Sequence, residues 1–151
     1  MDRDKPGSKI HALSKRGGLP ITVAVSATNT NDATALKPLV KAIPAIKSRR
    51  EPRRRKPTKL HTDKAYDHTN LRHWVRDCAI KIRIAGKGIE SGNKLGKHRW
   101  MIERTMAWLT GYRRLTLRHE RKATHFLAFL TLRAAITCHK KLAKNTTYDK
   151  L

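Results

Sequence analysis

Acidic residues are scarce in this sequence of 151 residues, which has 11 Asp and Glu against 35 Lys and Arg and a formal net charge of +24. Cysteine is scarce too: Cys78 and Cys138 stand far apart, without a CxxC pair or zinc-ligand spacing. This spacing indicates neither a disulfide scaffold nor a zinc finger, and both cysteines are expected to be reduced.

Long apolar runs are also missing, and the mean hydropathy is −0.65. This composition predicts no membrane span and no membrane partner. The residues before Lys9 lack the apolar core of a signal peptide, so we expect a cytoplasmic protein.

What the chain does have is basic charge spread from Lys5 to Lys150 and a hydrophobic content of 38%. The apolar fraction is sufficient for one folded domain with a modest core. The charge far exceeds the net charge of about 2 to 8 that suffices for solubility in a small domain. A polyanion, and nucleic acid first, is the expected partner.

The residue patterns predict an α/β chain. Two short apolar runs around Gly17-Gly18 predict a β-hairpin, and a strand, a helix and an alternating strand predict a parallel pair with a crossover. The expected segments are strands at 9–13, 21–26, 59–62 and 80–84, helices at 32–43, 68–78, 98–109 and 126–142, an exposed loop at 47–59 and a mobile loop at 86–96. The 47–59 loop, with Arg53, Arg54 and Arg55, fits a solvated linker as well as a loop that contacts phosphates.

Two of the few acids stand where chemistry could occur. Asp63 follows the predicted strand at 59–62, at the edge where α/β sheets usually carry their sites. Glu103 lies inside a predicted helix, at or near its apolar face, where a salt bridge to Arg99 or Arg104 would explain it equally well. If the two carboxylates converge, they could bind a hard divalent cation such as magnesium or manganese and support phosphoryl transfer.

Three segments of the chain form a recognisable set: HTDKAYD at 61–67, RWMIERTMAWL at 99–109, and YRRL at 112–115 with RHER at 118–121. Together they resemble the catalytic part of bacterial insertion-sequence transposases of the Asp-Asp-Glu (DDE) class. The stretches KPGSKIH at 5–11 and TNTND at 28–32 also resemble the pattern of this family, and the similarity runs in order along nearly the whole chain.

This resemblance implies a ribonuclease-H-like fold, with a mixed central sheet, flanking helices and a site for two magnesium ions. Residues 1–151 would be one partial catalytic domain with no separate DNA-binding domain. Asp63 matches the second acid of the family and Glu103 the third. The implied activity is nicking of DNA ends and strand transfer, with Arg104, Arg113 and Arg114 on the DNA backbone. Tyr66 and Trp108 are expected to be packing residues.

The beginning of the chain departs from the family pattern. The first acid of the family lies upstream of the segment that 5–11 matches, and neither Asp2, Asp4 nor Asp32 replaces it convincingly. The resemblance therefore predicts a fold without its first central strand and a chain that is inactive alone. It would be a remnant of a decayed element or the downstream half of a split reading frame.

Other functions stay open beside this one. The chain could be a non-catalytic basic DNA-binding protein that regulates transposition, by occupying DNA or by mixing with other transposase subunits. A ribosomal or packaging protein is less favoured, because it would not need the two acid-bearing segments.

Overall fold

The structure is a computed structural model that describes residues 7–45, 56–84 and 92–148. The chain divides into two compact units, which we describe separately. The first, here called the hairpin unit, comprises Met1–Asn29 and Trp100–Leu151. The second, here called the parallel-sheet unit, comprises Thr30–Arg99.

The hairpin unit begins with β1 (Ser8–Ser14) and β2 (Pro20–Ala27), which pair antiparallel with Ile10 opposite Val25. Gly18 adopts a φ of 82° in the connecting turn, a left-handed conformation that glycine adopts without steric cost. The predicted hairpin and its turn are therefore confirmed.

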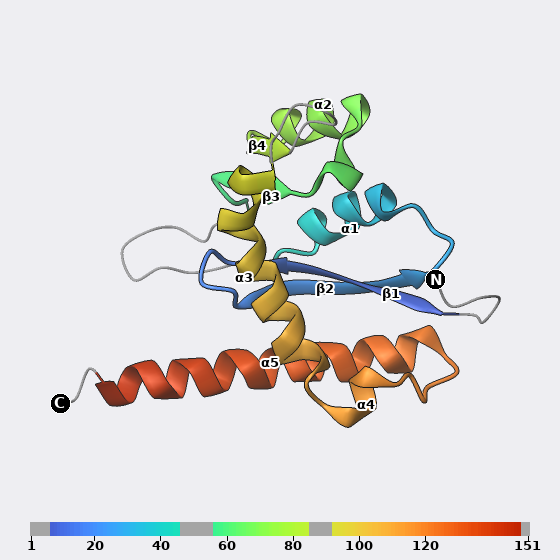
Figure 1. The fold of residues 1–151 in the computed structure, drawn as a ribbon, viewed down its shortest axis with the longest axis vertical. Coiled ribbons are helices and arrows are strands. Elements are labelled where there is room, and N and C mark those ends of the chain that lie inside the picture. Colours follow the sequence, from blue (N-terminus) through green and yellow to red (C-terminus); the bar gives the residue numbers. More distant parts are fainter. Residues whose placement is uncertain (1–6, 46–55, 85–91, 149–151) are drawn as a thin grey trace. The chain divides into compact units, whose positions relative to one another are not determined.

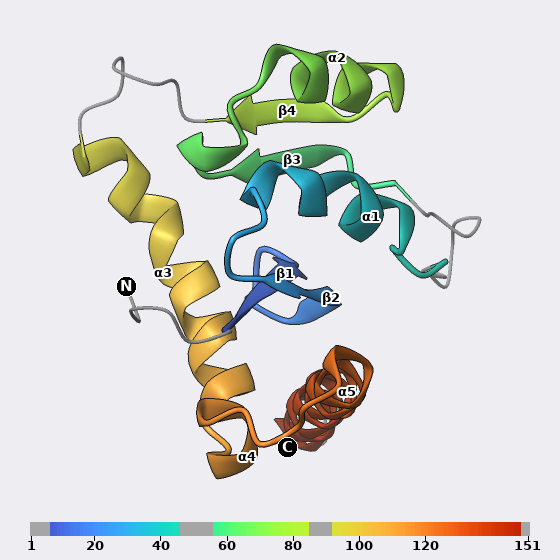
Figure 2. The same cartoon turned by 90° about the vertical axis from the view of Figure 1, so that its right-hand side faces the viewer.

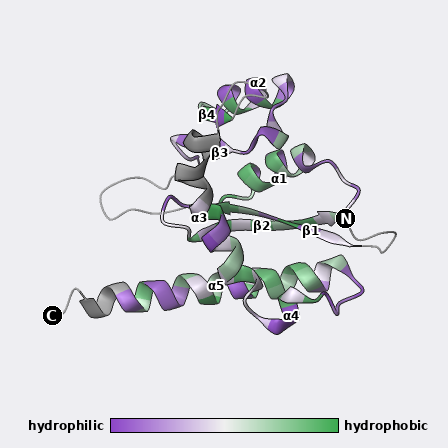
Figure 3. Cartoon of the chain, viewed as in Figure 1, coloured by the Kyte–Doolittle hydropathy of each residue, from purple (hydrophilic) through white to green (hydrophobic). Residues whose placement is uncertain are grey.

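Helices complete this unit: α3 (Gly92–Thr110), of which the part from Trp100 belongs here, α4 (Arg113–Thr116) and α5 (Ala123–Tyr148). Figures 1 and 2 show α5 lying along one face of the hairpin, and it packs against β2. The core of the hairpin unit consists of Leu109, Leu115, Phe126 and Leu130. Four residues of the hairpin pack against it: Ile10, Ala12, Val23 and Val25. Figure 3 shows hydrophilic turns along the C-terminal half of α5, beyond this core.

The parallel-sheet unit contains β3 (Lys59–Thr62) and β4 (Lys81–Ile84), which pair in parallel, with Leu60 beside Ile82. The crossover between them carries η2 (Lys64–Tyr66) and α2 (Thr69–Asp77). Leu71 and Val75 of α2 are buried, as the helical spacing of apolar residues predicts. The predicted strand–helix–strand crossover is confirmed.

The segment before β3 forms η1 (Asp32–Ala35) and α1 (Leu36–Lys41). A single helix was expected at 32–43, but its first turn is a 3-10 turn capped by Asn31, whose Oδ1 accepts from the backbone N–H of Ala33 at 3.0 Å. Pro38 lies within the first turn of α1, where its missing N–H is tolerated.

The end of α2 has an unusual residue in a left-handed position. Ala79 has a φ of 58°, and its N–H donates to the carbonyl of Arg76 at 2.7 Å. The N–H of Ile80 donates to the carbonyl of Val75 at 3.2 Å. These two bonds form a Schellman motif, with alanine at the position that is usually glycine.

Three expectations are wrong in part or stay predictions. The loop expected at 86–96 is wrong in its second half, because α3 begins at Gly92; residues 85–91 and most of the 47–59 loop lie outside the described residues. The described strands form two separate two-stranded sheets, so the ribonuclease-H-like mixed sheet stays a prediction. In the described part of the chain, no helix is long and apolar enough to cross a membrane.

Candidate functional site

Asp63 lies directly after β3, at the carboxyl end of the parallel strand pair, and its side chain is exposed. It caps η2: its Oδ1 accepts from the backbone N–H of Lys64 at 2.6 Å. Its other carboxylate oxygen, Oδ2, makes no hydrogen bond to a described residue. An exposed carboxylate with one fixed oxygen suits a cation ligand, because the cap holds the group in place.

An ion pair fixes the segment that follows Asp63. Arg72 of α2 donates through Nε to Asp67 Oδ1 at 2.7 Å, and its Nη2 donates to the carbonyl of Ile84 at 3.4 Å. Arg72 therefore links the segment after β3 to the end of β4. This brace holds the carboxyl ends of both strands at the edge where Asp63 lies.

Tyr66, at the end of η2, has a half-buried side chain. Burial raises the pKa of its phenol above the ordinary value, and the negative charges of Asp32 and Asp63 raise it further. Asp32 lies in η1, which contacts η2. Asp32 and Asp63 therefore act on the same phenol.

Glu103 lies on α3 in the hairpin unit, and its side chain is exposed rather than set at an apolar face. Of the two partners predicted for an ion pair with Glu103, Arg104 forms none with it among the described residues, and the side chain of Arg99 lies outside them. Arg104 points elsewhere: its Nη2 donates to the carbonyl of Gly17 at 2.5 Å, and its guanidinium lies 4.4 Å from the ring centre of Trp100 and 5.0 Å from that of Trp108.

Thr105, the residue after Arg104, also binds the turn of the hairpin, and it does so from a buried position. Thr105 is fully buried, and its hydroxyl donates to the carbonyl of Gly18 at 2.7 Å. Arg104 and Thr105 thus dock α3 on the turn of the hairpin, which fixes the rotation of the helix about its axis. Glu103 is presented to solvent by this docking.

The comparisons with known proteins decide the family. The family model described as transposase DDE domain matches residues 2–138. A protein of Burkholderia cepacia, described as a putative transposase for insertion sequence element IS402, is 40% identical over 143 residues, which are 95% of this chain and 68% of that protein. The chain belongs to the DDE transposase family. Its function is DNA transposition as an insertion-sequence transposase. No solved structure matches it.

In this DDE transposase, the two candidate acids lie in different units: Asp63 in the parallel-sheet unit and Glu103 in the hairpin unit. Among the described residues, no group of three or more His, Cys, Asp or Glu side chains could hold a metal ion. The convergence of Asp63 and Glu103 therefore stays a prediction.

The arginines predicted to bind DNA have different surroundings in this transposase. Arg113 is exposed on α4. Arg114 forms an ion pair with Glu120 at 3.4 Å between Nε and Oε1, and its guanidinium lies 4.7 Å from the ring centre of Phe129. Arg104 is engaged by the hairpin. Arg53, Arg54 and Arg55 lie outside the described residues.

Sequence reasoning missed the docking role of Arg104, although a signal existed. Trp100 and Trp108 stand four residues before and after it on α3, a spacing that places both rings beside the same side chain. It also assigned Trp108 to packing alone, whereas Trp108 also lines a basic pocket.

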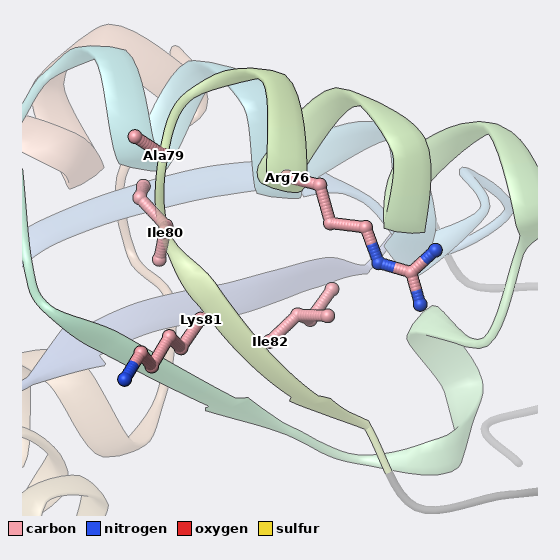
Figure 4. Close-up of a pocket in the computed structure, with 5 residues that line it drawn as sticks. All are labelled: Arg76, Ala79, Ile80, Lys81 and Ile82. Carbon is pink, nitrogen blue, oxygen red and sulfur yellow. The ribbon is translucent and has the colours of Figure 1, made fainter.

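A further pocket of about 430 Å³ lies against β4 and is lined by Arg76, Ala79, Ile80, Lys81 and Ile82. Figure 4 shows the side chains of Arg76 and Lys81 extending toward opposite sides of it. None of its lining residues is a carboxylate or a nucleophile, so it offers no group for the chemistry of a transposase.

Proposed function

We propose that Asp63 and Glu103 are ligands of one divalent cation, Mg²⁺ or Mn²⁺, in a ribonuclease-H-like catalytic domain that nicks DNA and transfers a strand. The observation that carries this proposal is the position of Asp63, exposed at the carboxyl end of a parallel strand pair and held by its own cap. Two carboxylates are oxygen donors that suit a hard cation.

The residues around each acid support this assignment. The brace between Arg72 and Asp67 keeps the segment after β3 in place, and the docking of Arg104 and Thr105 on the hairpin keeps Glu103 directed to solvent. A cation bound there would help to activate the attacking hydroxyl and to stabilise the leaving oxygen. Arg113 and Arg114 would bind the DNA backbone.

A second candidate is a DNA-binding regulator of transposition without catalysis, which associates with other transposase subunits. The net charge of +24 supports it, because this charge favours binding to DNA whether or not a metal site forms. The two candidates differ in one testable respect, namely whether Asp63 and Glu103 bind the same ion.

Iron-mediated cleavage of the polypeptide tests the shared site directly. Fe²⁺ takes the place of Mg²⁺ in an oxygen-ligand site, and with ascorbate and peroxide it cuts the backbone near the bound ion. We expect cuts near both residue 63 and residue 103 in the full chain, and suppression of both by excess Mg²⁺. Asp63→Asn should abolish the cut near residue 103, and Glu103→Gln the cut near residue 63, because each removes a ligand of the same ion.

Asp77→Asn is the matched control, since Asp77 is an exposed carboxylate at the end of α2. It should leave both cuts unchanged. Cuts near only one of the two acids, or cuts that survive both substitutions, would contradict the shared site and favour the regulator. Where metal-dependent nicking of DNA is detected, the same two substitutions should lower it at least about a hundredfold, because the metal contributes several kcal/mol to the transition state.

A further inference from the structure

A small basic pocket lies between α3 and α5, entirely within the hairpin unit. Its volume is about 210 Å³, and it is lined by Trp108 of α3 and by Arg133, Thr137, Lys140, Lys141 and Lys144 of α5. This volume is below the roughly 300–1,000 Å³ of pockets for drug-sized ligands. It suits a small anionic group such as a phosphate.

The lining residues that α5 contributes to this pocket lie on one face of the helix. Residues 133, 137, 140, 141 and 144 recur at intervals of three and four, which places them on one face of the helix. Four of the five are cationic. No carboxylate of a described residue forms an ion pair with any of these four, so their charge is not neutralised within the described part of the chain.

Arg133 is fixed by contacts to Trp108 and Tyr112. Its Nε donates to the carbonyl of Trp108 at 2.9 Å, and its guanidinium lies 3.3 Å from the ring centre of Tyr112. Its Nη1 is buried and has no hydrogen-bond partner among the described residues. A buried guanidinium donor without an acceptor is costly, and an anionic oxygen would satisfy it.

Lys140 and Lys141 lie beside two aromatic residues, where their ammonium groups could contact an anion in the pocket. Lys141 Nζ is 4.4 Å from the ring centre of Trp108, and Lys140 Nζ is 3.5 Å from the hydroxyl of Tyr112. The C-terminal end of α3 carries a partial negative charge, and one cation would suffice to complement it. The pocket has four cationic residues beside Trp108, which is more than this structural role needs.

We propose that this pocket binds a phosphate of a DNA strand, with Trp108 as its apolar wall. The ligand is DNA because the charge of the whole chain favours a polyanion and because a pocket of about 210 Å³ with four cationic lining residues has room for a phosphate. This inference uses one part of the proposed function, namely that the partner is DNA. The lining of this pocket includes neither acid and none of the arginines at 104, 113 and 114.

Salt-dependent binding of the full chain to a duplex oligonucleotide, measured by fluorescence anisotropy without divalent metal, tests this site. The triple substitution Lys140→Gln, Lys141→Gln and Lys144→Gln should make the slope of log affinity against log salt less steep by about 1, as expected for one lost phosphate contact. The matched control is Lys15→Gln, Arg16→Gln and Lys122→Gln, which removes the same charge from exposed positions outside the pocket in the same unit. Its slope should change by less than half as much. Equal changes in the two triple variants would overturn the proposal.

Tryptophan emission gives a second readout that does not depend on charge. DNA should change the emission of the wild-type chain and of Trp74→Phe, but change that of Trp108→Phe much less, because Trp108 is the ring beside the bound phosphate. An undiminished change in Trp108→Phe overturns the pocket. Since no metal is present, these outcomes are separate from the iron-cleavage test: loss of the pocket would leave the Asp63 and Glu103 site standing, and the reverse also holds.

Discussion

At the scale of single residues, Tyr66 reports the electrostatics of the candidate site. Its pKa is raised by burial first, then by Asp32 and Asp63. We predict that its phenol titrates above the ordinary value of about 10, and that Asp32→Asn and Asp63→Asn each lower its pKa, since each removes a negative charge that opposes the phenolate. Carbon-13 NMR of labelled tyrosine, assigned with Tyr66→Phe, measures it.

The sign of the stability effect follows from this shift. The pKa of Tyr66 is higher in the folded chain than in the unfolded chain. Its neutral phenol therefore contributes fully to the free energy of unfolding below a pH of about 10, and this contribution is lost as the pH rises through the folded pKa. Tyr66→Phe should therefore reduce the fall in stability at alkaline pH. A Tyr66 pKa at or below the ordinary value would contradict the burial of its phenol and the influence of these two charges.

At the scale of elements, the C-terminal end of α2 carries a correctable strain. Ala79 is exposed with a φ of 58°, where an L-residue other than glycine meets steric cost. We predict that Ala79→Gly raises the free energy of unfolding by about 0.5–1 kcal/mol, because relief of the left-handed strain exceeds the entropy that glycine loses on folding. Urea denaturation followed by circular dichroism checks this.

Ala42→Gly serves as the matched control for that change. Ala42 is also exposed and ends a helix of the same unit, but its φ is −80°. Glycine there should be neutral or destabilising, because no strain is relieved. Opposite signs for the two substitutions support the strain at Ala79, whereas equal effects would refute it.

Local patterns predicted most elements, and the exceptions have physical reasons. The hairpin and the crossover at 59–84 follow from turn glycines and apolar periodicity, which act over a few residues. The start of α3 was missed because Gly92 and Gly96 have low helix propensity, and cooperative extension of the long helix overrides it. Asp63 could be found from its place after a strand. The influence of Asp32 on Tyr66 could not, since it depends on contact between segments far apart in the sequence.

At the scale of the whole molecule, the net charge of +24 opposes compactness in both units. Like charges repel within a folded chain, and salt weakens this repulsion because the Debye length falls from about 30 Å at 0.01 M to about 8 Å at 0.15 M. We therefore predict that the thermal midpoint rises with ionic strength. A chain stabilised mainly by surface ion pairs would show the reverse, since salt weakens attraction too.

The measurement is thermal denaturation followed by circular dichroism in sodium chloride, repeated in potassium glutamate at equal ionic strength. Equal rises in the two salts indicate screening, because screening depends on ionic strength and not on which anion is present. Binding of duplex DNA should raise the midpoint further at low salt, and this added rise should shrink as salt releases the DNA. A midpoint that falls with salt in both electrolytes would mean that attractions among the few acids and many bases outweigh the repulsion, contrary to an excess of 35 basic over 11 acidic residues.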